Sequence, residues 1–154
     1  LTDEAKALLA VETPKELDNV TTMINGSVRE LCVAAGNACR ELGYEPILLT
    51  DQLACQAKEA GAFLASIART HARDNRSLAF IAGGETVVHL KGSGLGGRNQ
   101  ELVLAAATVL DGMPGAAMIS VGSDGTDGPT DAAGGYVDGD TVRELAKKGL
   151  DIVQ

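Results

Sequence analysis

Apolar residues recur along this chain at two spacings that predict its helices and strands. A spacing of three and four is clearest from Val28 to Leu42, where the apolar side chains fall on one helical face. Gly43 follows at the position where glycine commonly ends a helix. By the same criteria, helices are predicted over 1–10, 28–42, 54–72, 101–110 and 140–148.

Short apolar runs between turn-forming residues predict the strands. They fall at 20–24, 44–49, 77–82, 86–91 and 116–121. Strand and helix alternate along most of the chain. This alternation predicts an α/β fold, a layered α/β/α arrangement with a mostly parallel sheet and helices on its faces.

Composition narrows the class of partner. The chain has 154 residues, 45% of them hydrophobic, which is enough for one globular domain with its own core. Its net charge of −8 and aromatic content of 3% disfavour nucleic acid and anionic membranes as partners. No apolar run reaches the roughly 18 residues that would predict a membrane span. Local positive residues such as Lys91 and Arg98 can still hold a small anion.

The chain's ends and cysteines suggest its setting. The chain begins at Leu1 and not at a methionine, so we expect it to be a fragment of a longer chain. We expect residues 1–154 to form one α/β domain, in which 1–19 is a lead-in helix and linker. Cys32, Cys39 and Cys55 lack metal-ligand spacing, so we expect free thiols in a reducing, cytoplasmic setting. The oligomeric state is open, with a homodimer among the options.

A glycine-rich stretch from Gly83 to Glu101, GGETVVHLKGSGLGGRNQE, carries the first candidate site. Its glycines allow the backbone to approach a ligand, and it leads into a predicted helix through Arg98, whose planar fork suits an anion. Within it, Gly92, Gly94 and Gly97 also match the G-x-G-x-x-G pattern of dinucleotide sites. An anion-binding loop, a nicotinamide site and a turn without ligand are all consistent with this stretch.

A second stretch, GSDGTDGPTDAAGG over 122–135, follows a predicted buried strand. It holds three carboxylates, Asp124, Asp127 and Asp131, where open α/β sheets usually place ligands. Oxygen ligands of this kind suit Mg²⁺, which shares its coordination with water and phosphate. Aspartate and glycine also favour turns by themselves, so a turn without metal is the alternative.

Together these two stretches closely resemble the MOFRL-domain glycerate kinases, a group of glycerate 2-kinases often labelled hydroxypyruvate reductase. The resemblance runs from about Val20 to the chain end, and 77–154 is the MOFRL-like segment that carries the motifs. It implies transfer of phosphate from ATP to D-glycerate, giving 2-phosphoglycerate, with Mg²⁺. It also implies two α/β domains, of which this is the C-terminal one. The active site would lie between them, and the N-terminal domain, absent here, would be a partner.

The matching residues receive expected roles from the same resemblance. Arg98 would hold a carboxylate or phosphate, and Glu85 or Asp127 would orient or deprotonate the glycerate hydroxyl. The expected catalytic residues are Glu85, Lys91, Arg98 and Asp127. The expected substrate- or phosphate-binding residues are Gly83, Gly84, Thr86, Gly94, Gly96, Gly97, Asn99, Gln100 and Thr126. The expected metal ligands are Asp124, Asp127 and Asp131.

Two other functions stay open at this point. One is an NAD(P)-dependent hydroxypyruvate reductase, as the common label suggests. The other is a non-catalytic module that binds a small anion.

Overall fold

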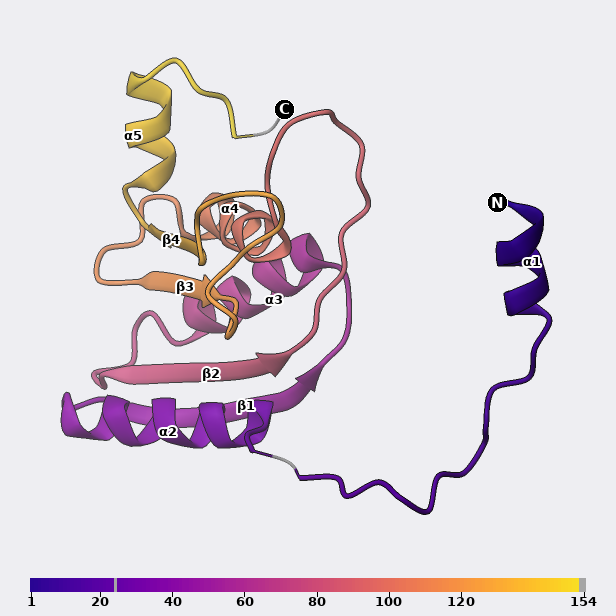
Figure 1. The fold of residues 1–154 in the computed structure, drawn as a ribbon. Helices are drawn as coiled ribbons and strands as arrows, with labels where there is room; N and C mark the ends of the chain where they lie inside the picture. Colours follow the sequence, from indigo (N-terminus) through magenta and orange to yellow (C-terminus); the bar gives the residue numbers. More distant parts are fainter. Residues whose placement is uncertain (24, 153–154) are drawn as a thin grey trace.

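The computed structural model describes residues 1–23 and 25–152. Its elements follow one another in the alternating order that the sequence predicts (Figure 1). They are α1 (Asp3–Leu9), α2 (Val28–Glu41), β1 (Glu45–Leu53), α3 (Ala57–Thr70), β2 (Leu78–Gly84), α4 (Arg98–Leu110), β3 (Ala117–Val121), β4 (Gly134–Asp138) and α5 (Thr141–Lys147).

The described strands form two pairs. β1 and β2 are parallel, with Glu45 opposite Leu78 at one end and Leu53 opposite Gly84 at the other. β3 and β4 are antiparallel, and here Val121 lies opposite Gly134. The parallel pair requires the α3 crossover between its strands, as expected of an α/β fold. The antiparallel second pair makes the sheet structure more mixed than the sequence pattern alone indicates.

The helices cover the strands from two sides. α2 packs along β1 and β2, whereas α3 and α4 pack against each other and α4 packs against β3 and β4. Figure 1 shows α2 on the lower side of β1 and β2 and the α3–α4 pair on the upper side. The layered α/β class predicted from the sequence is confirmed.

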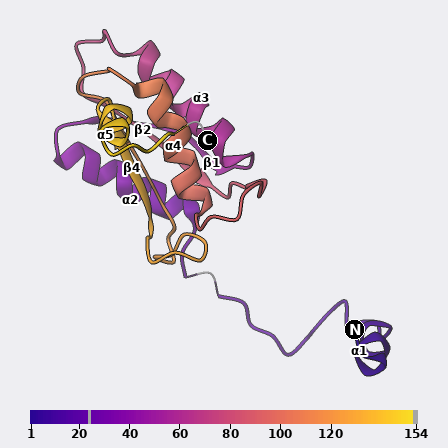
Figure 2. The ribbon, with the colours of Figure 1, turned by 90° about the horizontal axis from the view of Figure 1, so that it is seen from above.

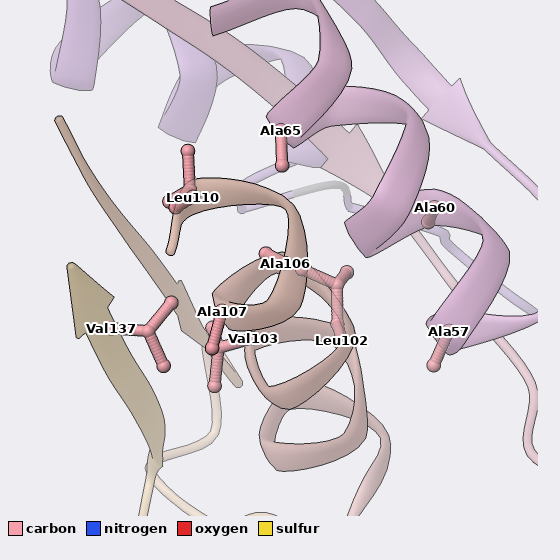
Figure 3. Close-up of a cluster of buried hydrophobic side chains, with 9 residues drawn as sticks. All are labelled: Ala57, Ala60, Ala65, Leu102, Val103, Ala106, Ala107, Leu110 and Val137. Carbon is pink, nitrogen blue, oxygen red and sulfur yellow. The ribbon is translucent and has the colours of Figure 1, made fainter. Parts of the chain in front are cut away.

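The core lies around α4. Its buried face carries Leu102, Val103 and Leu110, which meet small side chains of α3 and Val137 of β4 (Figure 3). Gly61 of α3 lies so close to α4 that an added side chain there would overlap the Leu102 carbonyl. Such tight packing fixes α4 against two neighbouring elements. The N-terminus of α4 is therefore held in a defined position.

α1 stands apart from the rest of the molecule and is joined to it by a long extended segment (Figures 1 and 2). Thr2 caps this helix, since its hydroxyl accepts a hydrogen bond from the Ala5 amide. Leu1, Leu8 and Leu9 are nevertheless largely exposed. No described helix is both long and apolar enough to cross a membrane.

Two strand predictions differ from the structure. Residues 86–91 form no strand, and only Val87 makes a single bridge, to Gln56. β2 ends at Gly84, which has a φ of 150° and packs against Leu53. Beyond it the chain stays beside β1 through a few backbone hydrogen bonds, such as those from the Glu85 amide to the Leu53 carbonyl and from the Val87 amide to the Cys55 carbonyl. β1 runs to Leu53, beyond the predicted end at residue 49, and its pairing register shifts around Thr50.

Two further differences involve weak strand signals. β4 was not predicted, because its two leading glycines resemble the end of a loop; they are needed there, since a side chain on Gly135 would overlap Val103 of α4. The strand predicted at 20–24 is absent over residues 20–23, and residue 24 lies outside the described residues.

Candidate functional site

The two motif stretches meet at one end of the molecule. The first leaves the C-terminal end of β2, continues as a loop over 85–97 and enters α4 at Arg98. The second is the loop over 122–133, between β3 and β4. Residues 85–87 are still hydrogen-bonded beside residues 53–57. Figure 1 shows the later part of the 85–97 loop as an arch that stands away from the packed elements before it returns to α4.

Asp127 joins the two stretches. Its side chain is only 2% exposed and lies against the first turn of α4. Oδ1 accepts hydrogen bonds from the backbone amide and the side-chain amide of Asn99, both at 3.0 Å. Oδ2 accepts the equivalent pair from Gln100, at 2.9 and 3.1 Å. A carboxylate can accept about four hydrogen bonds, so Asp127 is fully occupied.

Two hydroxyl groups extend this contact. Ser120 of β3 donates to Oδ1 of Asn99 at 2.7 Å. Thr130 accepts a bond from Nε2 of Gln100 and donates one to the Asp127 carbonyl. We call Asp127, Asn99, Gln100, Ser120 and Thr130 the Asp127 cluster. The contribution of Ser120 was missed from the sequence, where the only signal is one hydroxyl inside an otherwise apolar strand.

Glycines allow the two loops to approach this closely. A side chain on Gly97 would overlap the Asp127 carboxylate, and one on Gly128 would overlap the Gly96 carbonyl. Gly128 also has a φ of 61°, which favours glycine. Gly97 and Gly128 are therefore needed as glycines for contact within the chain, besides any contact with a ligand.

The charge of Asp127 is stabilised where it lies. Burial raises the pKa of this carboxyl, but the hydrogen bonds from Asn99 and Gln100 together lower it below its ordinary value. The ionised group also faces the positive end of the α4 dipole. Because Asp127 occupies the amides of Asn99 and Gln100, these two amides cannot also bind a substrate anion.

Arg98 has the opposite environment. It is the first residue of α4, between the two glycines and Asn99, yet its side chain is nearly half exposed. Its Nη1 lies 2.8 Å from Oε1 of Glu85, which is itself mostly exposed. An exposed pair of this kind contributes little to stability, so both groups are free to exchange partners at small cost.

The loop beside Arg98 is open. Side chains added to Gly94 or Gly96 would meet no described atom within 4 Å, and neither residue has a positive φ. Lys91 is exposed on the same loop and makes no ion pair with the described residues. The loop therefore presents backbone and one lysine outward, next to the arginine.

The remaining predicted residues divide into buried and exposed. Gly83 lies against Val28 and Cys32, with no room for a side chain. Thr86 is only 8% exposed, and its hydroxyl forms no hydrogen bond with the described residues. Thr126 is exposed on the 122–133 loop. Thr86 is thus a largely buried residue directly after Glu85 of the Glu85–Arg98 pair.

The three aspartates do not form one metal site. Asp127 has no oxygen lone pair left for a metal or a proton, so its predicted roles as a metal ligand and as a base do not fit this geometry. Asp124 accepts a bond from the Thr126 amide, and Asp131 is exposed. Among the described residues, no three acidic, histidine or cysteine side chains gather to hold a metal ion.

Fold and site define an α/β domain that presents an exposed arginine at a helix start, beside a glycine-rich loop. Residues 78–154 match the MOFRL family, which covers half of the chain. The chain belongs to this family.

Curated relatives and solved structures agree with this assignment. The chain is 47% identical to a D-glycerate 2-kinase of Thermotoga maritima, over 99% of its own length and 37% of that relative's. It is 40% identical to a glycerate 2-kinase of Pyrococcus horikoshii, over 92% and 33% of the two lengths. A crystal structure of a glycerate kinase from T. maritima superposes with a TM-score of 0.83 at 46% identity, over 100% of this chain and 38% of that one. The chain thus spans little more than a third of these relatives.

Proposed function

We propose that the full-length protein is a glycerate kinase that transfers phosphate from ATP to D-glycerate, giving 2-phosphoglycerate, and that this domain binds the anionic substrate. The observation that carries the proposal is Arg98. Its guanidinium is exposed at the start of α4, while the amides of Asn99 and Gln100 behind it are occupied by Asp127. We therefore assign anion binding to the Arg98 side chain and not to these two amides.

Arg98 suits this role by chemistry and position. Its fork can make two parallel hydrogen bonds to a carboxylate or phosphate. Glu85 now occupies one of its nitrogens, and a substrate carboxylate would replace it there. The released Glu85 would lie within reach of the glycerate hydroxyl, where it would orient that group.

The open loop supplies the second part of the site. The backbone of Gly94 and Gly96 is accessible, and Lys91 adds a positive charge beside it. A phosphate group would gain from both, since phosphoryl transfer depends mostly on positioning and charge stabilisation. We assign Gly94, Gly96 and Lys91 to the phosphate side of the site and Arg98 to the carboxylate side.

ATP and Mg²⁺ belong to the proposal as well. The donor set of this domain does not make a complete metal site, because Asp127 is engaged elsewhere. Asp124 and Asp131 remain the candidate metal ligands, in a site that other groups would complete. The Mg²⁺ dependence of an Asp124→Asn variant would test this role.

The proposal also includes a partner and a cellular location for this domain. The rest of the full-length chain, expected from relatives that are more than twice as long, would be the partner that covers the exposed loops. All three cysteines are free, which suits a reducing, cytoplasmic location.

The decisive experiment is an assay of ADP formation by the full-length protein with ATP and D-glycerate. We expect glycerate-dependent ADP release. A parallel measurement of NADH absorbance with hydroxypyruvate separates the two chemistries. NADH oxidation without ADP release would replace the kinase by a reductase, and binding without either would replace it by an anion-binding module.

A further inference from the structure

We infer that Asp127 is a positioning residue for Arg98: its carboxylate fixes the start of α4 so that the guanidinium points at the substrate anion. This inference rests on the proposed function. It gives Asp127 a task that needs neither metal nor proton transfer.

The N-terminus of α4 lacks a cap of its own. Gly97 stands at the capping position and has no side chain with which to accept a hydrogen bond. A usual capping residue accepts from the amide two or three positions further on. Asp127, which lies 28 residues from Asn99 in sequence, accepts from the amides at both of these positions. The cap thus comes from the loop that follows β3.

Arg98 is held on both sides by this contact. Before it, Gly97 packs directly on the Asp127 carboxylate, and Gly96 packs on Gly128. After it, Asn99 is bonded to Asp127 by both its backbone and its side chain. The backbone of Arg98 therefore has little freedom, while its side chain stays exposed. A misplacement of about 1 Å is enough to reduce catalysis strongly.

Asp127 acts only through Arg98, because its own oxygens are inaccessible. All four acceptor positions are filled by Asn99 and Gln100, and the side chain is 2% exposed. Direct contact with substrate is excluded by this burial. Loss of the Asp127 carboxylate should hence lower kcat/KM for D-glycerate only in a protein that still has Arg98.

A double-mutant cycle in the full-length protein tests this dependence. Asn at position 127 keeps one acceptor oxygen but turns an amide NH₂ toward two N–H donors. We expect Asp127→Asn to lower kcat/KM for D-glycerate about tenfold or more, yet less than about twofold in an Arg98→Ala background. If Asp127→Asn lowered kcat/KM by the same factor in the wild type and in the Arg98→Ala background, the inference would be overturned.

Asp138 offers a matched control. Its Oδ1 accepts hydrogen bonds from the Asp140 amide and the Thr141 hydroxyl at the start of α5. It pairs with Ala117, at the opposite end of β3 from the 122–133 loop. Asp138→Asn should lower stability but leave kcat/KM unchanged. A similar kinetic loss in this variant would mean that general destabilisation explains the effect.

A milder variant covers the case in which Asp127→Asn fails to fold. Ser120→Ala removes only the bond to Oδ1 of Asn99. We expect a smaller loss in kcat/KM, about two- to fivefold, that again disappears in the Arg98→Ala background. A loss that persists there would contradict the inference.

A second readout separates this inference from the proposed function. The Nε–H NMR signal of Arg98, assigned by its loss in Arg98→Ala, should shift in Asp127→Asn and stay in place in Asp138→Asn. If the wild type releases no ADP with glycerate, the proposed function fails but this signal still tests the positioning. An Arg98 signal that is unchanged by Asp127→Asn would refute it.

Discussion

Arg98 and Asp127 lie at the same end of α4 in different environments. The cation is exposed beside an open loop, and the anion is buried under four hydrogen bonds. Both were predicted as site residues from their motifs, and sequence spacing could not distinguish them. The difference depends on which loop returns to the helix, and that is a property of the fold.

The planar fork of Arg98 is the first feature to test. Arg98→Lys keeps the charge but removes the two parallel bonds, so we expect kcat/KM for glycerate to fall by roughly 10- to 150-fold, equivalent to about 1.5–3 kcal/mol. Steady-state kinetics of the full-length protein measures this. Arg143→Lys on α5, whose arginine is exposed and paired with Asp140, is the control and should leave kinetics unchanged. Unaltered kinetics in Arg98→Lys would make Arg98 structural.

The lowered pKa of Asp127 predicts a pH effect. A carboxyl whose folded pKa lies below its unfolded value of 3.8 stabilises the fold above that pH, and loses this contribution as pH falls through the folded pKa. We expect the free energy of unfolding to fall more steeply below about pH 4 in the wild type than in Asp127→Asn. Urea unfolding between pH 7 and pH 3 measures both. If the free energy of unfolding depended on pH in the same way in the wild type and in Asp127→Asn, Asp127 would not be the carboxyl responsible.

At the scale of elements, the α3–α4 contact places the site. α4 packs on α3 through small residues on one side and on β3 and β4 on another. Its first turn therefore appears at a defined point beside the end of β2. Helix propensity and packing make opposite demands at Gly61, since alanine favours the helix while the Leu102 carbonyl leaves no room for it.

Two glycine substitutions decide which of these effects dominates. Gly61→Ala should destabilise the protein by roughly 1–3 kcal/mol because of overpacking against α4. Gly36→Ala in α2 is the matched control: its nearest neighbour would be Ile81 at an ordinary 3.5 Å, so it should stabilise by up to about 1 kcal/mol. Urea unfolding of both variants measures whether each substitution lowers or raises the free energy of unfolding. Stabilisation by Gly61→Ala would show that the helices separate easily.

At the scale of the whole molecule, the site faces outward. The 85–97 arch, Lys91 and Arg98 are exposed at one end, and α1 stands apart with its leucines exposed (Figure 1). Relatives of this chain are more than twice as long. These surfaces are where we expect the rest of the full-length chain to contribute.

Residues 1–154 alone should therefore not turn over. We expect no glycerate-dependent ADP formation by this chain under conditions in which the full-length protein is active. Circular dichroism on the same sample would verify that the α/β structure has formed. A turnover rate comparable with that of the full-length protein would mean that this domain is sufficient for the reaction.

The sequence by itself determined two things: the helices and strands that have a clear local periodicity, and the family to which the motifs belong. The apolar spacing predicted α2 and α3, and the runs at 77–82 and 116–121 predicted β2 and β3, because these signals lie within a few neighbouring residues. The motifs also located Arg98 beside a glycine-rich loop. Strand 86–91 was predicted wrongly, because its residues pair with the rest of the fold only through one isolated bridge at Val87, and such pairing is not visible in the local sequence.

The tertiary structure decided the roles within the site. The strand β4 and the role of Ser120 could not be predicted, because a glycine-rich strand and a single hydroxyl have no distinctive local pattern. Both are recognised only when β3 pairs with β4 and Ser120 donates its hydrogen bond to Asn99 of α4. Asp127 looked like a metal ligand as long as only its loop was known. Its partners Asn99 and Gln100 lie 28 and 27 residues away, and long-range hydrogen bonds of this kind leave no periodic trace in a sequence.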